Sequence, residues 1–85
     1  MKIRTLIIDD EPIALEKLRT YVEKVPFLEL VGECQSGLEA ISLMAQSDVD
    51  VVFTDINMPD LSGMDFVKSL PSAPMVVFMT AYAQY

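Results

Sequence analysis

The segment Val51-Val52-Phe53-Thr54-Asp55 is a mostly apolar run that ends in a carboxylate. The earlier segment Leu6-Ile7-Ile8 has the same form, because it leads directly into Asp9 and Asp10. Apolar runs without alternation are typical of parallel strands that helices cover on both faces. If the two runs are neighbouring parallel strands, about 4.8 Å apart, their carboxyl ends bring several acids to one edge of the sheet. Such a cluster repels itself, and we expect it to attract a cation.

The composition is that of one small globular domain. The chain has 85 residues, a hydrophobic fraction of 52% and a formal net charge of -7. This acidic balance argues against direct binding of nucleic acid or of an anionic membrane surface. The chain has one cysteine, Cys34, so it cannot form an internal disulfide, and no apolar run reaches the length of a membrane span. We therefore expect a cytoplasmic protein with no membrane partner.

The stretch after the first apolar run predicts a helix. Pro12 is tolerated in a first helical turn, and Asp10 is a candidate for the N-cap. Apolar side chains then recur at helical spacing as far as Val25, and Pro26 ends the pattern. Residues 28–33 mix apolar and acidic positions around a glycine, which predicts an edge strand.

Two more helices and one more strand are predicted further along the chain. Ser36 and Glu39 form a capping-box pattern, which indicates the start of a second helix. Residues 64–70 predict a third helix, and the apolar run 75–80 predicts a central, buried strand. Connections of this length favour parallel strands joined by right-handed crossovers. The predicted fold class is therefore α/β, with four strands and three helices.

Four polar residues, Asp9, Asp10, Asp55 and Thr80, fall at the carboxyl ends of predicted strands, where open parallel sheets bind their ligands. Each has a structural alternative: an acid there can be a helix cap or a turn former, and Thr80 can be an ordinary strand residue. A hard cation such as Mg²⁺ would be held by carboxylates, a carbonyl and waters, with room for phosphate oxygens. Asp55 could then attack a phosphoryl group as a nucleophile, and Thr80 could donate a hydrogen bond to it.

Three motifs together resemble the receiver domain of bacterial two-component response regulators. They are Leu6-Ile7-Ile8-Asp9-Asp10-Glu11-Pro12, Asp55-Ile56-Asn57-Met58-Pro59 and Val76-Val77-Phe78-Met79-Thr80-Ala81, in that order. The resemblance implies a flavodoxin-like (CheY-like) doubly wound parallel sheet, whose family strand order is 2-1-3-4-5. For the four strands predicted here the implied order is 2-1-3-4.

The resemblance also implies the roles of the site residues. Asp55 would be the phospho-acceptor. The implied ligands of Mg²⁺ are Asp10 directly, Asp9 through water, Asn57 through its main-chain carbonyl, and Asp55 itself. Thr80 would bind a phosphoryl oxygen and reorient on phosphorylation, with the backbone N–H of Ala81 beside it. The phosphoryl group would come from a sensor histidine kinase or a small phosphodonor, and a receiver catalyses its own transfer and hydrolysis.

The sequence departs from the family pattern at its carboxyl end. A receiver has a fifth strand that carries a lysine, and a fifth helix, whereas this sequence stops near the start of the fourth helix. The resemblance therefore implies a receiver over residues 1–85 that is truncated, with impaired phosphoryl transfer. The strand 75–80 would then be an open apolar edge, and we expect a homodimer or swapped assembly through it. Residues 80–85 are similar to receivers that precede a LytTR-type DNA-binding domain, which a longer parent protein would carry.

Two other functions remain open from the sequence. A haloacid-dehalogenase-like phosphatase also uses an aspartate after a strand, but it has a second acid two residues later, where this chain has Asn57. The stronger alternative is an interaction module that binds a kinase or another receiver without being phosphorylated.

Overall fold

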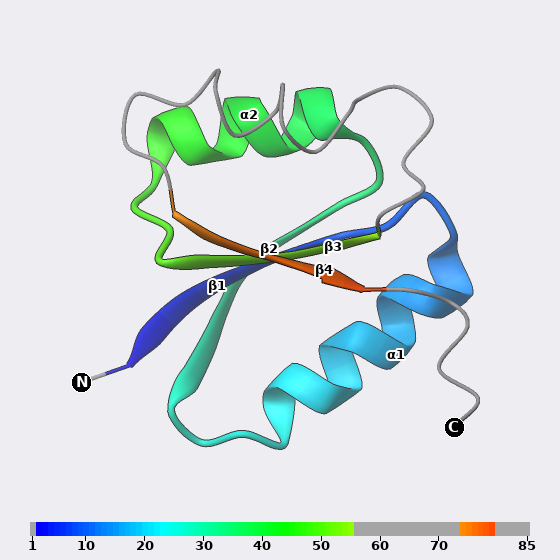
Figure 1. Ribbon diagram of the computed structural model, residues 1–85, viewed down its shortest axis with the longest axis vertical. Helices are drawn as coiled ribbons and strands as arrows, with labels where there is room; N and C mark the ends of the chain where they lie inside the picture. Colours follow the sequence, from blue (N-terminus) through cyan, green and yellow to red (C-terminus); the bar gives the residue numbers. More distant parts are fainter. Residues whose placement is uncertain (1, 56–73, 80–85) are drawn as a thin grey trace.

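The computed structural model describes residues 2–55 and 74–79, which form a parallel sheet with a helix on each face (Figure 1). The strands are β1 (Ile3–Ile8), β2 (Leu28–Cys34), β3 (Val51–Asp55) and β4 (Met75–Met79). The helices are α1 (Pro12–Glu23) and α2 (Gly37–Gln46). The predicted helix over 64–70 lies outside the described residues. Neither described helix is long and apolar enough to cross a membrane.

The strand order is β2-β1-β3-β4, with every neighbouring pair parallel, so the predicted order 2-1-3-4 is confirmed. The edge position predicted for residues 28–33 is also confirmed, because β2 borders the sheet. β4 forms the other border of the described sheet. The central, buried position that its composition suggested is therefore wrong for these residues, whereas the open apolar edge implied by the family resemblance agrees with the described sheet. Met75 is 69% exposed, since no described strand pairs with its outer side.

β1 lies at the centre of the hydrophobic core and contributes to both faces of the sheet. Figure 1 shows α2 on one face of the sheet and α1 on the other. Leu6 and Ile8 belong to the cluster on the α2 side, and Ile7 belongs to the cluster on the α1 side. The cluster beneath α2 comprises Leu6, Ile8, Cys34, Ala40 and Val52. The cluster beneath α1 comprises Ile7, Leu15, Leu18 and Val22. This two-sided burial explains why the β1 sequence is apolar without alternation.

The start of α1 differs from the prediction. Asp10 is not the N-cap: that position belongs to Glu11, whose side chain makes no capping hydrogen bond. Pro12 occupies the start of the helix, where its fixed φ suits the first turn and its missing N–H costs nothing. The carboxylate of Asp9 instead accepts a hydrogen bond from the backbone N–H of Glu11, at 2.9 Å. Asp10 is exposed and is thereby left for another role.

The predicted capping box of α2 is confirmed. The hydroxyl of Ser36 accepts a hydrogen bond from the backbone N–H of Glu39 at 3.2 Å. The Glu39 carboxylate reaches back to the backbone N–H of Gln35, at 2.9 Å. Both ends of the turn are therefore held, so α2 starts at a defined point after β2.

Asp50 ties together the amino ends of three strands. Its carboxylate accepts a hydrogen bond from the backbone N–H of Arg4 at 2.8 Å, and its own N–H donates to the Arg4 carbonyl at 2.8 Å. Its carbonyl accepts from the backbone N–H of Met75 at 3.1 Å. These bonds set where β3 and β4 begin relative to β1, and hence which residues stand together at the carboxyl edge.

Gly32 occupies a tight position next to an irregularity in the pairing of β1 with β2. A Cβ atom there would lie 2.9 Å from Cδ1 of both Leu6 and Leu43. We expect Gly32→Ala to lower the free energy of unfolding by about 1 to 2 kcal/mol. The clash of the added methyl group with Leu6 and Leu43 should outweigh the stabilisation gained because alanine restricts the unfolded chain more than glycine does. Urea denaturation checks this. Leu43→Ala should cost less in the Gly32→Ala background than in the wild type, and additive effects would contradict the proposed clash.

Cys34 is 2% exposed, and burial, with the nearby charge of Glu39, raises the pKa of its thiol from 9.0 to about 11. The unfolded chain therefore loses this proton at lower pH than the folded chain does. The thiol's contribution to stability is intact below pH 9 and should fall as pH rises toward 11, by roughly 3 kcal/mol at most. The measurement is the difference in unfolding free energy between wild type and Cys34→Ala across this range. A difference that stays constant with pH would contradict the assignment.

Candidate functional site

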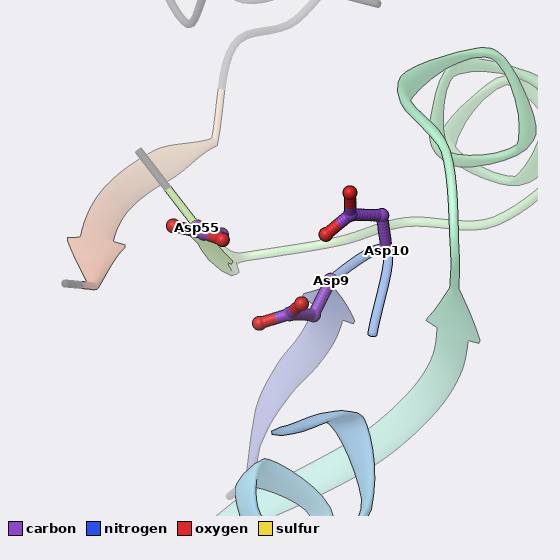
Figure 2. Close-up of side chains that lie close together, drawn as sticks. All are labelled: Asp9, Asp10 and Asp55. Carbon is purple, nitrogen blue, oxygen red and sulfur yellow. The ribbon is translucent and has the colours of Figure 1, made fainter. Parts of the chain in front are cut away.

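The carboxyl ends of β1 and β3 bring three aspartates together. Ile8 pairs with Thr54 in the sheet, so the residues that follow them, Asp9 and Asp55, stand on adjacent strands. Figure 2 shows their side chains, together with that of Asp10, sharing the space at these strand ends. One carboxylate oxygen from each of the three residues lies within 4.8 Å of the other two. The predicted convergence of these acids is confirmed.

Asp9 is the most constrained member of the cluster. Only 8% of its surface is exposed, and its backbone N–H donates to the Cys34 carbonyl at 3.0 Å. Burial raises the pKa of its carboxyl group, and the negative charges of Asp55 and Asp10 raise it further. The hydrogen bond from the Glu11 N–H acts in the opposite direction. The ionised form of Asp9 is therefore held at an energetic cost that a positive charge would relieve.

The donor set suits a hard divalent cation. Every side-chain ligand offered by the three aspartates is a carboxylate oxygen, the ligand type that Mg²⁺ and Ca²⁺ prefer. Asp10 is exposed and Asp55 is half-buried, so the cluster is open to water and to a further ligand on one side. Mg²⁺ keeps several waters when it binds proteins, which such an open arrangement allows.

A pocket of about 190 Å³ adjoins the acids, between α1 and the end of β4. Its lining combines carboxylates with apolar and cationic side chains. The described lining residues are Asp9, Glu11, Ala14, Lys17, Leu18, Tyr21, Asp55 and Met79. The sequence did not lead us to expect that α1 lines a pocket, because the helical spacing of its apolar residues was interpreted as packing. The spacing of Ala14, Lys17 and Tyr21 along the helix was the available signal.

The remaining predicted site residues, Asn57, Thr80 and Ala81, lie outside the described residues. The sheet register nevertheless indicates which residue is next to the strand end that precedes Thr80. Met79, which precedes it, pairs with Asp55 across β3 and β4. The carboxyl end of β4 is therefore next to the third aspartate of the cluster.

Curated proteins similar to this chain are bacterial regulators. The transcriptional regulatory protein BtsR of Escherichia coli K12 is 41% identical over 85 residues, which cover 98% of this chain and 36% of BtsR. The sensory transduction protein LytR of Staphylococcus saprophyticus is 34% identical over 83 residues, covering 94% of this chain and 33% of LytR. The chain thus spans about a third of the length of these relatives.

Solved structures show the same fold. The signal receiver domain of the putative response regulator NarL from Mycobacterium tuberculosis matches with a TM-score of 0.82 and 26% identity, over 95% of this chain and 68% of that one. The response regulatory domain of mrkE from Klebsiella pneumoniae matches with a TM-score of 0.79 and 28% identity, over 96% and 70%.

The aspartate cluster, the strand order and these similarities agree with a direct match to a protein family. The sequence model of the response regulator receiver domain matches residues 5–85. The chain therefore belongs to the family of receiver domains of two-component response regulators.

Proposed function

We propose that this chain accepts a phosphoryl group on Asp55, with Mg²⁺ as cofactor and a sensor histidine kinase as the physiological donor. The observation that carries the proposal is the aspartate cluster at the ends of β1 and β3, in which one carboxylate oxygen from each residue lies within 4.8 Å of the others. Asp55 ends a buried strand and is half-exposed beside an open pocket, so a donor can reach its carboxylate.

In the proposed reaction a carboxylate oxygen of Asp55 attacks phosphorus. The bond from phosphorus to the donor breaks, and its electron pair leaves with the donor's imidazole nitrogen or, for acetyl phosphate, with the acetate oxygen. The product is an aspartyl phosphate. The chain's task is to hold Asp55 in line with the donor and to offset the repulsion between carboxylate and phosphoryl oxygens.

Asp9, Asp10 and the main-chain carbonyl of Asn57 would hold the Mg²⁺, together with Asp55. Bound there, the cation would neutralise part of the negative charge on the phosphoryl oxygens. The raised pKa of Asp9 supports this arrangement, because burial and the two neighbouring carboxylates disfavour a negative charge that a bound cation would offset. The Glu11 N–H fixes one oxygen of the Asp9 carboxylate, which holds this side chain at the cluster.

Thr80 and Ala81 would bind the transferred group. The residue before them, Met79, pairs with Asp55 in the sheet, which supports placing their polar groups near the acceptor. Thr80 would donate its hydroxyl hydrogen to a phosphoryl oxygen, and the backbone N–H of Ala81 would donate to another. Reorientation of Thr80 would report phosphorylation to the rest of the domain.

The proposed partners beyond the kinase are a second copy of the chain and an output domain. Met75 and Phe78 are exposed on β4, at the border of the described sheet, which supports pairing of two copies through this edge. Because the chain spans about a third of BtsR and LytR, we propose that a parent protein continues into a DNA-binding domain of the LytTR type. The acidic chain itself would not contact DNA.

Incubation with acetyl phosphate and Mg²⁺ tests the acceptor role. Intact-mass spectrometry should show one phosphoryl adduct in the wild type, and Asp55→Asn should abolish it because the amide is not a nucleophile. Asp48→Asn, an acid outside the cluster, is the matched control and should react like the wild type. Absence of any adduct would favour the interaction module, and release of phosphate without an adduct would favour the phosphatase.

A second test uses the electrostatics of Asp9. Asp9→Asn keeps an oxygen that can accept from the Glu11 N–H but removes one charge from the cluster. Since the folded-state pKa of Asp9 is raised, its ionisation destabilises the fold once pH exceeds that pKa. Without divalent cations at pH 7, Asp9→Asn should therefore be more stable than the wild type.

Adding Mg²⁺ should reverse this ranking, because cation binding stabilises the wild-type fold and the variant has lost a ligand. Thermal unfolding with and without Mg²⁺ measures both effects. Equal Mg²⁺-dependent stabilisation of the two proteins would contradict the proposed metal site.

A further inference from the structure

The peptide group between Cys34 and Gln35 connects the start of α2 to the aspartate cluster. Its carbonyl oxygen accepts a hydrogen bond from the backbone N–H of Asp9 at 3.0 Å. Its N–H donates to a carboxylate oxygen of Glu39 at 2.9 Å. Because the carbonyl and the N–H of a trans peptide point in opposite directions, Glu39 and Asp9 are joined through this one peptide from its two sides.

The Glu39 carboxylate strengthens this chain of hydrogen bonds. A hydrogen bond to an ionised acceptor is stronger than a bond between neutral groups. Hydrogen bonds in a chain also polarise one another, so the Cys34 carbonyl becomes a better acceptor for the Asp9 N–H. The charge of Glu39 acts at this point of the chain, since the pKa of the Cys34 thiol is raised mainly by burial and additionally by Glu39.

Packing and a second hydrogen bond hold the neighbouring atoms. Cys34 and Ile8, the residue before Asp9, are buried in the same cluster beneath α2. The Asp9 carboxylate is held separately, by the backbone N–H of Glu11 at 2.9 Å. Asp9 is therefore anchored at its side chain by one hydrogen bond and at its backbone by another, and Glu39 supports the backbone anchor.

We propose that Glu39 is a positioning residue for the metal site, which acts through the Gln35 peptide to hold the backbone of Asp9 where its carboxylate binds the cation. This inference rests on the proposed Mg²⁺ site. It gives Glu39 a function beyond the capping of α2. Ser36 offers the contrast, because its hydroxyl bonds to the Glu39 N–H and not to the peptide that holds Asp9.

Hydrogen exchange of the Asp9 amide, measured by NMR in the metal-free protein, tests this connection directly. Glu39→Ala should speed the exchange roughly three- to tenfold relative to the other amides of β1, because the bond from Asp9 to the Cys34 carbonyl is weakened. Glu39→Gln keeps an oxygen that can accept from the Gln35 N–H and loses the charge, so its effect should be smaller.

Ser36→Ala is the matched control. It removes the other hydrogen bond of the capping box and should lower the melting temperature about as much as Glu39→Ala does. The exchange of the Asp9 amide relative to the rest of β1 should stay as in the wild type.

Mg²⁺ affinity, measured by calorimetry, gives a second readout. Glu39→Ala should weaken binding roughly three- to tenfold, because groups that orient metal ligands affect metal affinity without touching the ion. Glu39→Gln should weaken it less. Since both variants lack the negative charge, this difference separates positioning from the loss of a distant charge. Ser36→Ala should bind Mg²⁺ like the wild type.

Each outcome decides the proposal. Faster Asp9 exchange and weaker Mg²⁺ binding in Glu39→Ala, with partial recovery in Glu39→Gln, support it. If Glu39→Ala and Ser36→Ala behave alike in both measurements, or if Glu39→Gln is as impaired as Glu39→Ala, the positioning role is overturned while the metal site stands. If the wild type binds no Mg²⁺, the proposed metal site falls, and the role of Glu39 in it falls as well.

Discussion

The parallel pairing of β1 with β3 is the constraint on which the rest of the molecule depends. β1 is buried on both faces, between the cluster under α1 and the cluster under α2, so a shift in its register would expose apolar side chains on either side. Hydrogen bonds of Asp50 fix the amino ends of β1, β3 and β4 relative to one another. With the register set, Asp9 and Asp55 must meet at the opposite edge.

Packing and electrostatics oppose each other where Asp9 and Asp55 come together. Hydrophobic burial of the two strands brings three carboxylates into one small region. Burial and the neighbouring charges raise the pKa of Asp9 as a result. Clustered carboxylates repel one another until a cation offsets part of their charge. The cluster is therefore responsive to cations and to phosphate. The same packing that stabilises the sheet thus prepares its edge for ligand chemistry.

α1 contributes to this edge in two ways. Its buried side packs Leu15, Leu18 and Val22 beneath the sheet, which fixes the position of the helix. Its first turn is set by Pro12 and by the hydrogen bond from the Glu11 N–H to Asp9, so Asp10 is exposed beside the cluster and is not used as a cap. The side of α1 that borders the pocket lies next to Asp9 and Asp55, which line the same pocket.

The fold and the acids of the site could be predicted from the sequence because both follow from short-range patterns. Continuous apolar runs identify buried parallel strands, and the residues that end those runs must fall at the carboxyl edge. The strand order came from the family resemblance, and the edge position of β2 could be read from its mixed composition.

The tertiary structure alone decided three further features. Asp10 was a candidate both for the helix cap and for a metal ligand, and the hydrogen bond from the Glu11 N–H to Asp9, which accompanies a start of the helix at Pro12, is visible only in space. The exposure of β4 depends on which strands flank it, and the run Met75–Met79 itself carries no sign of an edge. The pocket beside the aspartates appears only once α1 is docked, because it is formed by elements distant in the sequence.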